Sequence, residues 1–412
     1  MTLPKQSPPI HRLRQRLADF FGLRRSIVAM LVMAVLVGLG EKMAERFLPI
    51  YLLALGGGPL IIGVLNGLDN MLSALYSFPG GYLSDRLGYK RALLAFNLIA
   101  LFGYLIVILI PSWPAVIVGA IFFLSWSAIS LPATMSLVAA VLPDKKRTMG
   151  VSMHSLVRRI PMALGPLIGG LLISTYGERE GVRLAFVVAF LLGLVALFMQ
   201  QAMIEETPVR VNQAERNPFK IFNLISPSLR NLLVSDILVR FAEQIPYAFV
   251  VVWAMRNHNL SAVQFGLLTA IEMVTAMLIY IPIAYLADRN TKKPFVVITF
   301  CFFTIFPLVL LFSNRFEIFV VAFVIRGLKE FGEPTRKALI MDLAPEDKKA
   351  AIFGAYYLIR DIIVSAAAFS GALFWMISPQ VNFLVAFGFG LLGTLFFAIF
   401  GRDLGRQPPQ KD

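Results

Sequence analysis

Ionisable side chains occur at helical spacing inside stretches of sequence that are otherwise apolar. Glu41 and Glu45 lie four residues apart, with Lys42 and Arg46 beside them. Two later stretches carry a similar mixture of charges: Asp236, Arg240 and Glu243 in one, and Arg326, Lys329, Glu330 and Glu333 in the other. Residues three or four apart share a helix face, and charged groups inside apolar helices are costly and mark functional sites. We expect the following residues to bind substrate or protons: Glu41, Glu45, Arg46, Arg240, Glu243, Arg326, Lys329 and Glu330.

Proton binding is the chemistry that these carboxylates suggest. A buried carboxylate can bind and release a proton near neutral pH, and Glu45, Glu243 and Glu330 are the candidates. The neighbouring Lys and Arg side chains oppose this role because they stabilise the ionised form. The alternative interpretation is that the charges pair only with one another and hold helices together.

The elements that carry these residues are expected to be membrane-spanning helices. The chain has 58% hydrophobic and 15% charged residues, whereas soluble domains are about 45–50% apolar. Apolar runs of roughly 20 residues follow one another, which indicates transmembrane helices, and they do not alternate as the strands of a β-barrel do. We expect about twelve helices, at 26–54, 59–83, 91–111, 114–141, 149–174, 182–203, 231–256, 263–287, 294–313, 317–342, 351–376 and 381–400.

The sequence contains an internal repeat. Residues 62–86 align with residues 265–289 on a closing Asp-Arg, so that Asp69 corresponds to Glu272, and further along Arg158 corresponds to Arg360. Inverted or parallel repeats in a hydrophobic chain are typical of transporters whose halves rock about a central site. The predicted fold is all-α, with six-helix bundles at 26–203 and 231–400, a basic amphipathic tail at 1–25, a linker at 204–230 and a tail at 401–412.

Basic residues are unevenly distributed between the predicted turns. They gather in the N-terminal tail, near 86–91, 145–147, 292–293 and 348–349, and in the C-terminal tail, whereas the alternate turns hold few. This asymmetry predicts that both termini are cytoplasmic and that the protein lies in the plasma (inner) membrane. The net charge of +14 therefore reflects membrane topology, and we do not expect nucleic acid as a partner.

The segment GGYLSDRLGYKR at 80–91 resembles the signature of the major facilitator superfamily between helices 2 and 3. Gly81, Asp85, Arg86, Gly88 and Lys90 match that signature, and Tyr89 departs from it. The resemblance covers the whole chain and implies that this loop takes part in gating on the cytoplasmic side. The two glycines allow a tight turn and a close helix approach. The alternative is that these residues only orient the loop.

A second resemblance lies in the expected fifth helix. GPLIGG at 165–170, with Gly165 and Pro166, looks like the Gly-Pro-x-x-Gly-Gly of antiporters in this family and favours export. The alternative is a packing face of small residues. The run GEKMAERFLPIY at 40–51 is also similar to the Glu-Arg-Phe segment of proton-coupled oligopeptide transporters, with its first Glu one position off.

The resemblance also implies which helices line the central cavity. These would be helices 1, 4, 7 and 10, of which three carry the charges described above, while helix 4 offers Trp126. The resemblance further implies that helix 2 packs on helix 11 and helix 5 on helix 8, across the boundary between the halves. We therefore predict two symmetry-related ion pairs in at least one conformation, Asp69–Arg360 and Glu272–Arg158.

Nothing in the sequence predicts an enzyme. It has no nucleotide-binding Gly-Lys-Ser/Thr loop, its three histidines are scattered, and its single cysteine, Cys301, has no partner, so we expect no cofactor and no metal. We predict a monomeric secondary transporter in the lipid bilayer that exports a small charged or amphiphilic organic solute in exchange for protons. The alternatives are proton-coupled uptake of an organic anion or a peptide-like solute, and a non-transporting protein such as a sensor or scramblase.

Overall fold

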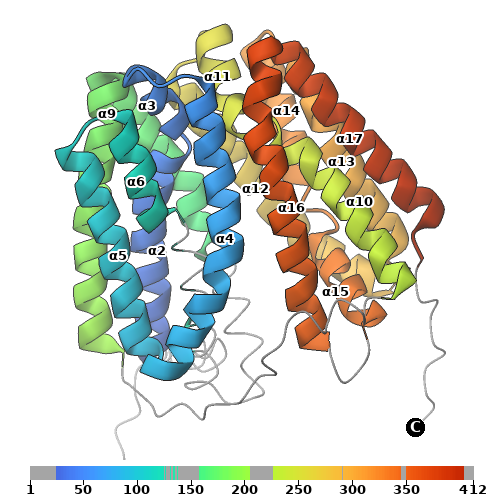
Figure 1. Ribbon diagram of the computed structural model, residues 1–412, viewed down its shortest axis with the longest axis horizontal. Coiled ribbons are helices and arrows are strands. Elements are labelled where there is room, and N and C mark those ends of the chain that lie inside the picture. Colours follow the sequence, from blue (N-terminus) through green and yellow to red (C-terminus); the bar gives the residue numbers. More distant parts are fainter. Residues whose placement is uncertain are drawn as a thin grey trace, which may run out of the picture.

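The computed structural model describes residues 25–124, 126, 130, 133–134, 137, 157–204, 226–289, 291–344 and 349–402. These residues form two helical bundles that stand side by side (Figure 1). The all-α fold with two bundles is as predicted. The N-terminal tail, most of the linker and nearly all of the C-terminal tail lie outside the described residues.

The first bundle contains the helices that precede the linker. Its described elements are α2 (Arg25–Glu45), α3 (Leu48–Ala54), α4 (Pro59–Leu87), α5 (Tyr89–Leu109), α6 (Trp113–Phe123) and α9 (Arg159–Met203). Proline stands in the first turn of α3, α4 and α6, where its missing N–H costs no hydrogen bond. Gly177 interrupts α9 with φ 81° and ψ 169°, so α9 comprises the fifth and sixth predicted helices.

The second bundle contains two interrupted helices. Its elements are α10 (Pro227–Gln244), η2 (Tyr247–Phe249), α11 (Val250–Val252), η3 (Trp253–Asn257), α12 (Ala262–Arg289), α13 (Lys293–Leu311), α14 (Phe316–Leu328), α15 (Glu333–Leu343), α16 (Lys349–Ile377) and α17 (Pro379–Phe400). The sequence predicts continuous helices over 231–256 and 317–342, but Pro246 and Pro334 lie at the two interruptions. A proline disrupts the helix before it because its ring clashes with a preceding carbonyl.

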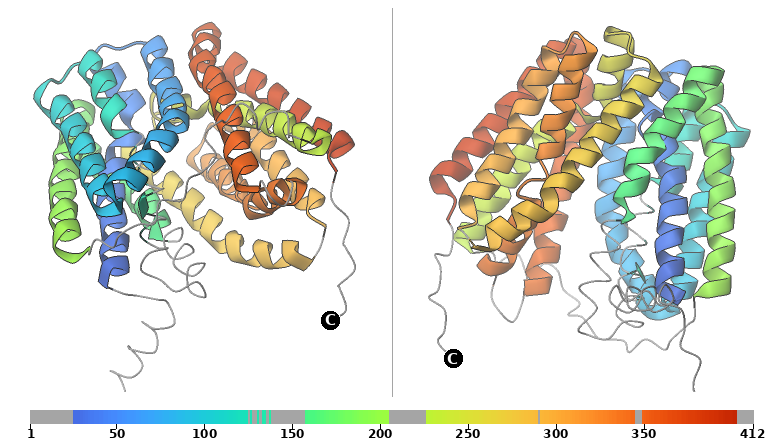
Figure 2. Two further views of the ribbon diagram at one scale, coloured as in Figure 1. Left: turned by 60° about the horizontal axis from the view of Figure 1, so that its bottom comes forward. Right: turned by 180° about the vertical axis from the view of Figure 1, so that it is seen from behind.

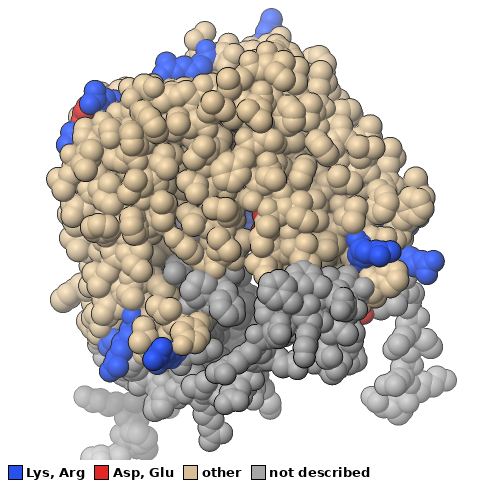
Figure 3. Space-filling model, in the orientation of Figure 1, with Lys and Arg blue, Asp and Glu red and all other residues tan. Residues whose placement is uncertain are grey.

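The outer surface suits a lipid environment. By length and composition, eight of the described helices are apolar enough to cross a membrane. The face in Figure 3 is almost free of charged residues across its middle, and Lys and Arg gather toward its two ends. Large apolar side chains such as Phe198, Leu278 and Ile399 are exposed on the helices, as expected where hydrocarbon replaces water.

The two bundles meet at one end of the molecule. α4 packs on α16 and α9 packs on α12, which are the pairings that the family resemblance implies. Glycines make these contacts close: Gly63 and Gly67 lie against Ala372 and Phe369, and a Cβ on Gly170 would stand 2.5 Å from the carbonyl oxygen of Ala262. The bundles diverge toward the end that bears the C-terminus (Figures 1 and 2).

Candidate functional site

A cavity lies between the two bundles. Both bundles line it at the points where their helices are interrupted. Arg46 lies between α2 and α3, and Tyr247 begins η2 just after the end of α10. The lining residues are Glu45, Arg46, Leu48, Pro49, Leu65, Asn66, Asp69 and Leu124 from the first bundle, and Tyr247, Ala248, Val250, Val251, Phe265 and Arg326 from the second. We call this space the central cavity.

Tyr247 joins the charges of the two bundles. The guanidinium carbon of Arg46 lies 5.2 Å from the centre of the Tyr247 ring, and that of Arg326 lies 5.3 Å from it. Both distances suit cation–π attraction. Arg326 is also anchored within its own bundle, because its Nε lies 3.3 Å from a carboxylate oxygen of Glu272. Tyr247 was not among the predicted site residues; its position directly after Pro246 was the available signal.

Three other predicted residues of the first bundle lie around a separate cavity. Glu41, Trp126 and Arg158 line this space together with Lys42. The Lys42 ammonium is 3.2 Å from Glu41 and also contacts Glu45. In this conformation Trp126 lines this separate cavity and is not among the residues that line the central cavity. Its indole N–H donates to Oδ1 of Asn97 at 2.8 Å, which holds the ring inside the first bundle.

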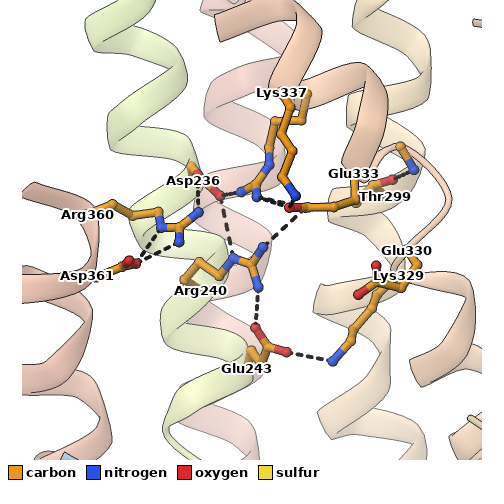
Figure 4. A network of polar contacts seen from close by, with 12 residues as sticks. Asp236, Arg240, Glu243, Thr299, Lys329, Glu330, Glu333, Lys337, Arg360 and Asp361 are labelled. Atoms are coloured by element: carbon orange, nitrogen blue, oxygen red, sulfur yellow. Dashed lines mark hydrogen bonds and ion pairs between the residues drawn. The ribbon is translucent and has the colours of Figure 1, made fainter. Parts of the chain in front are cut away.

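The second bundle contains a chain of ion pairs (Figure 4). Arg240 of α10 is 2.6 Å from Glu243 on its own helix and 3.3 Å from Glu333 of α15. Glu243 in turn accepts a hydrogen bond from the ammonium of Lys329 at 2.6 Å. The structure thus brings the predicted residues Arg240, Glu243 and Lys329 together. Lys329 also lies 3.6 Å from Glu272. Because Glu272 pairs with Arg326, this contact connects the chain of ion pairs to the central cavity.

The most buried part of this chain of ion pairs is centred on Arg336, which was not among the predicted site residues. Arg336 pairs with Asp236 and donates two hydrogen bonds, 2.8 and 2.7 Å long, to the carboxylate of Glu333. The hydroxyl of Tyr356 donates to Asp236 at 3.0 Å. The spacing of Glu333 and Arg336 matched that of an ion pair on one helix face, and this signal was available in the sequence.

The two ion pairs predicted between the bundles are not formed in this conformation. Glu272 is paired with Arg326 and Lys329, and Arg360 lies 2.7 Å from Asp361 and 3.5 Å from Asp236. Asp361 directly follows Arg360 in the sequence and therefore competes locally for its guanidinium. Repeat symmetry predicts the depth of a residue but not the direction of its side chain, so nearer partners within each bundle take these charges.

A different ion pair bridges the bundles. Arg159, at the start of α9, lies 3.1 Å from Glu330, in the segment between α14 and α15. Asn66 and Asn70 of α4 add two hydrogen bonds to Gln244 at the end of α10, 3.1 and 3.2 Å long. These polar contacts must break or shift if the bundles move relative to each other.

The loop that carries the family signature is described in part. Gly88 separates α4 from α5 with φ 81°, a conformation that favours glycine. Lys90 then joins α5 to the end of α9, because its ammonium donates to the carbonyl of Gln201 at 3.0 Å. Arg86 is exposed and donates to the hydroxyl of Tyr82 at 3.3 Å. Gly81 lies within α4, and the side chain of Asp85 lies outside the described residues.

The GPLIGG segment packs in two directions. A Cβ on Gly165 would stand 2.8 Å from the Cβ of Lys42 in α2, and Gly169 lies against Met43. On the other side, the carbonyl of Pro166 touches Gly266, and Gly170 lies against Ala262, both of the second bundle. The segment therefore packs closely on both sides, and part of it lies on the contact between the bundles.

Comparisons with known proteins agree with this architecture. A model of the Major Facilitator Superfamily matches residues 30–228 and 232–412. An uncharacterized MFS-type transporter of Methanocaldococcus jannaschii is 21% identical over 84% of this chain and 87% of that relative. The multidrug resistance protein MdtG of Proteus mirabilis is 24% identical over 91% of this chain and 94% of its own length. A crystal structure of the nucleoside transporter NupG, 12% identical, shares the fold with a TM-score of 0.78 over 92% of this chain and 100% of that chain.

Proposed function

The chain belongs to the Major Facilitator Superfamily, and we propose that it is a secondary transporter that exports small charged or amphiphilic organic solutes in exchange for protons. The observation that carries this proposal is the central cavity, to which Arg46 and Asp69 contribute from one bundle and Tyr247 and Arg326 from the other. A solute bound there touches both bundles at once. It can therefore favour one relative position of the bundles over another, provided that its affinity differs between them.

Carboxylates near the cavity supply the sites for protons. Glu45 and Asp69 line the cavity itself. Glu330 contacts Arg159 across the two bundles, so that a change in its charge alters a contact between them. Proton binding at these groups would in this way couple the proton gradient to the movement of the bundles.

The direction of transport is inferred from the relatives. One of them is called a multidrug resistance protein, and the GPLIGG segment is similar to an antiporter signature. Both features support export. We also propose that the protein is a monomer in the plasma (inner) membrane and that both termini are cytoplasmic. In that orientation, the signature residues Gly81, Asp85, Arg86, Gly88 and Lys90 lie at the cytoplasmic gate.

Inverted membrane vesicles test this proposal. Their cytoplasmic face is outside, and respiration makes the interior acidic, which a trapped fluorescent dye reports. A solute that is exported in exchange for protons should dissipate this gradient when it is added outside. A panel of organic cations, anions and zwitterions should contain at least one such solute, and vesicles without the protein should not respond. Acidification of the interior when a solute is added to right-side-out vesicles would instead indicate uptake together with protons. If no solute causes a proton flux in either orientation, the result would favour a sensor or scramblase.

A further inference from the structure

Among the described residues, two opposite charges in the central cavity, Arg46 and Asp69, form no ion pair, and from this we infer that the transported solute is a small zwitterion. Its anionic group is bound by Arg46 and Arg326, and its ammonium group is bound by Asp69. This inference rests on the proposed transport function and specifies the chemical class of its substrate. It is carried by the contacts of these three residues.

The anionic group has donors from both bundles. Arg46 contacts the ring of Tyr247, but it forms no ion pair or hydrogen bond with any other described residue. Arg326 uses its Nε toward Glu272, and its two terminal nitrogens form no hydrogen bond within the described part of the chain. Guanidinium groups suit planar carboxylates because they present several N–H donors in a fixed geometry. Both arginines contact the ring of Tyr247 and line the cavity, so an anionic group in this space meets a guanidinium from each bundle.

Among the described residues that line the cavity, Asp69 is the acceptor available to the ammonium group. Asp69 is half-buried, lines the same cavity and forms no ion pair or hydrogen bond with another described residue. Its neighbours on α4 are already engaged, because the amides of Asn66 and Asn70 both donate to Gln244. Glu45, the other carboxylate of the cavity, contacts the ammonium of Lys42. Asp69 is therefore the carboxylate that a ligand can reach without breaking an ion pair.

A zwitterion matches this arrangement better than an ion of one sign. A purely anionic ligand would leave Asp69 unpaired and close to a second negative charge, and a purely cationic ligand would leave Arg46 unpaired. The rest of the cavity wall is apolar, with Leu65, Leu124 and Val251 among its residues, and accommodates a hydrocarbon side chain.

Matched probes of one carbon skeleton test this inference with the purified full-length protein. Leucine, phenylalanine and tryptophan carry both charges. Their methyl esters keep only the ammonium group, and their N-acetyl derivatives keep only the carboxylate. Binding is measured by isothermal titration and by thermal stabilisation. We expect at least one of the three zwitterions to bind roughly tenfold or more tightly than its ester and its N-acetyl derivative, since each charge-assisted hydrogen bond contributes separately.

Two variants should show which end of the ligand each cavity residue recognises. Arg46→Gln should weaken binding of the zwitterion roughly tenfold or more and leave binding of the ester unchanged. Asp69→Asn should weaken binding of the zwitterion and leave binding of the N-acetyl derivative unchanged. Arg46→Lys keeps the charge and should retain part of the affinity, which separates charge recognition from a folding defect. Arg315→Gln, at an exposed position outside the cavity, is the matched control and should behave as the unaltered protein.

The inference is overturned if no zwitterion of the set binds more tightly than its singly charged derivatives, or if either cavity variant weakens all three probe forms equally. These results are distinct from a failure of the proposed function. Solute-dependent proton flux driven by an ester or by an N-acetyl derivative alone would preserve the transport proposal and refute the zwitterion. Absence of flux with every probe, together with tight and selective zwitterion binding, would refute transport and preserve the binding site.

Discussion

Removing the guanidinium of Arg336 should destabilise the second bundle strongly. The side chain of Arg336 is 1% exposed and pairs with Asp236, which is equally buried, and with Glu333. Breaking a buried ion pair by removing one partner costs about 3–5 kcal/mol, because the other charge remains buried without compensation. Arg336→Met keeps much of the apolar volume and leaves both carboxylates without their main cation.

Other contacts in the structure place the expected loss toward the lower end of that range. After the substitution, Asp236 keeps the Tyr356 hydroxyl at 3.0 Å and Arg360 at 3.5 Å, and Glu333 keeps Arg240 at 3.3 Å. We therefore expect Arg336→Met to lower the free energy of unfolding by about 3 kcal/mol. The double variant Asp236→Asn with Arg336→Met should recover part of the loss, because one of the uncompensated charges is gone.

Equilibrium unfolding in mixed micelles of dodecyl maltoside and SDS, followed by circular dichroism, measures these differences. Arg315→Met is the control at an exposed position, where a substitution is expected to change stability by no more than about 0.5 kcal/mol. If Arg336→Met matches this control, or if the double variant is less stable by the full sum of the two single losses, then the chain of ion pairs does not stabilise the bundle as described.

Three further perturbations test the coupling and the movement of the bundles. Neutralising Glu45 or Glu330, each as the Gln variant, should abolish proton-driven transport in proteoliposomes while membrane insertion persists; full transport by both variants would show that neither carries the coupling proton. Asp85→Asn should increase leakage or slow transport, and unchanged kinetics together with unchanged thiol-probe accessibility of the cytoplasmic face would mean that the signature is only structural here. Gly170→Val places side-chain atoms against the Ala262 carbonyl, so spin labels attached to the two bundles at the end where they meet should move apart. An unchanged distance distribution would show that this contact tolerates a side chain.

The helices could be predicted because hydrophobicity acts along the chain, and their pairing across the bundles could be predicted from the family resemblance. That resemblance implies that α4 packs on α16 and α9 on α12, and the structure has these contacts. The interruptions near Pro246 and Pro334 were less evident, since transmembrane helices tolerate proline where neighbouring groups satisfy the backbone. These interruptions matter because they place Tyr247 beside the cavity and Glu330 beside Arg159.

Side-chain partners were predicted less well, because each charge has several candidates within reach. Arg360 was expected to meet Asp69, but it contacts Asp361 and Asp236. Trp126 was expected at the central site, but Asn97 holds its indole inside the first bundle. In both cases a nearer polar group satisfies the side chain, and sequence spacing does not reveal the direction in which a side chain turns.

The central claim is that the protein moves a solute across the membrane in exchange for protons that move in the opposite direction. The direct measurement is solute accumulation in proteoliposomes that contain only the purified protein, with an imposed acid-inside pH gradient and detection of the solute by mass spectrometry. We predict that a solute from the panel accumulates above its external concentration while the gradient lasts, and that a protonophore abolishes this accumulation. Equilibration without accumulation, or accumulation that persists after the gradient has been collapsed, would contradict the claim.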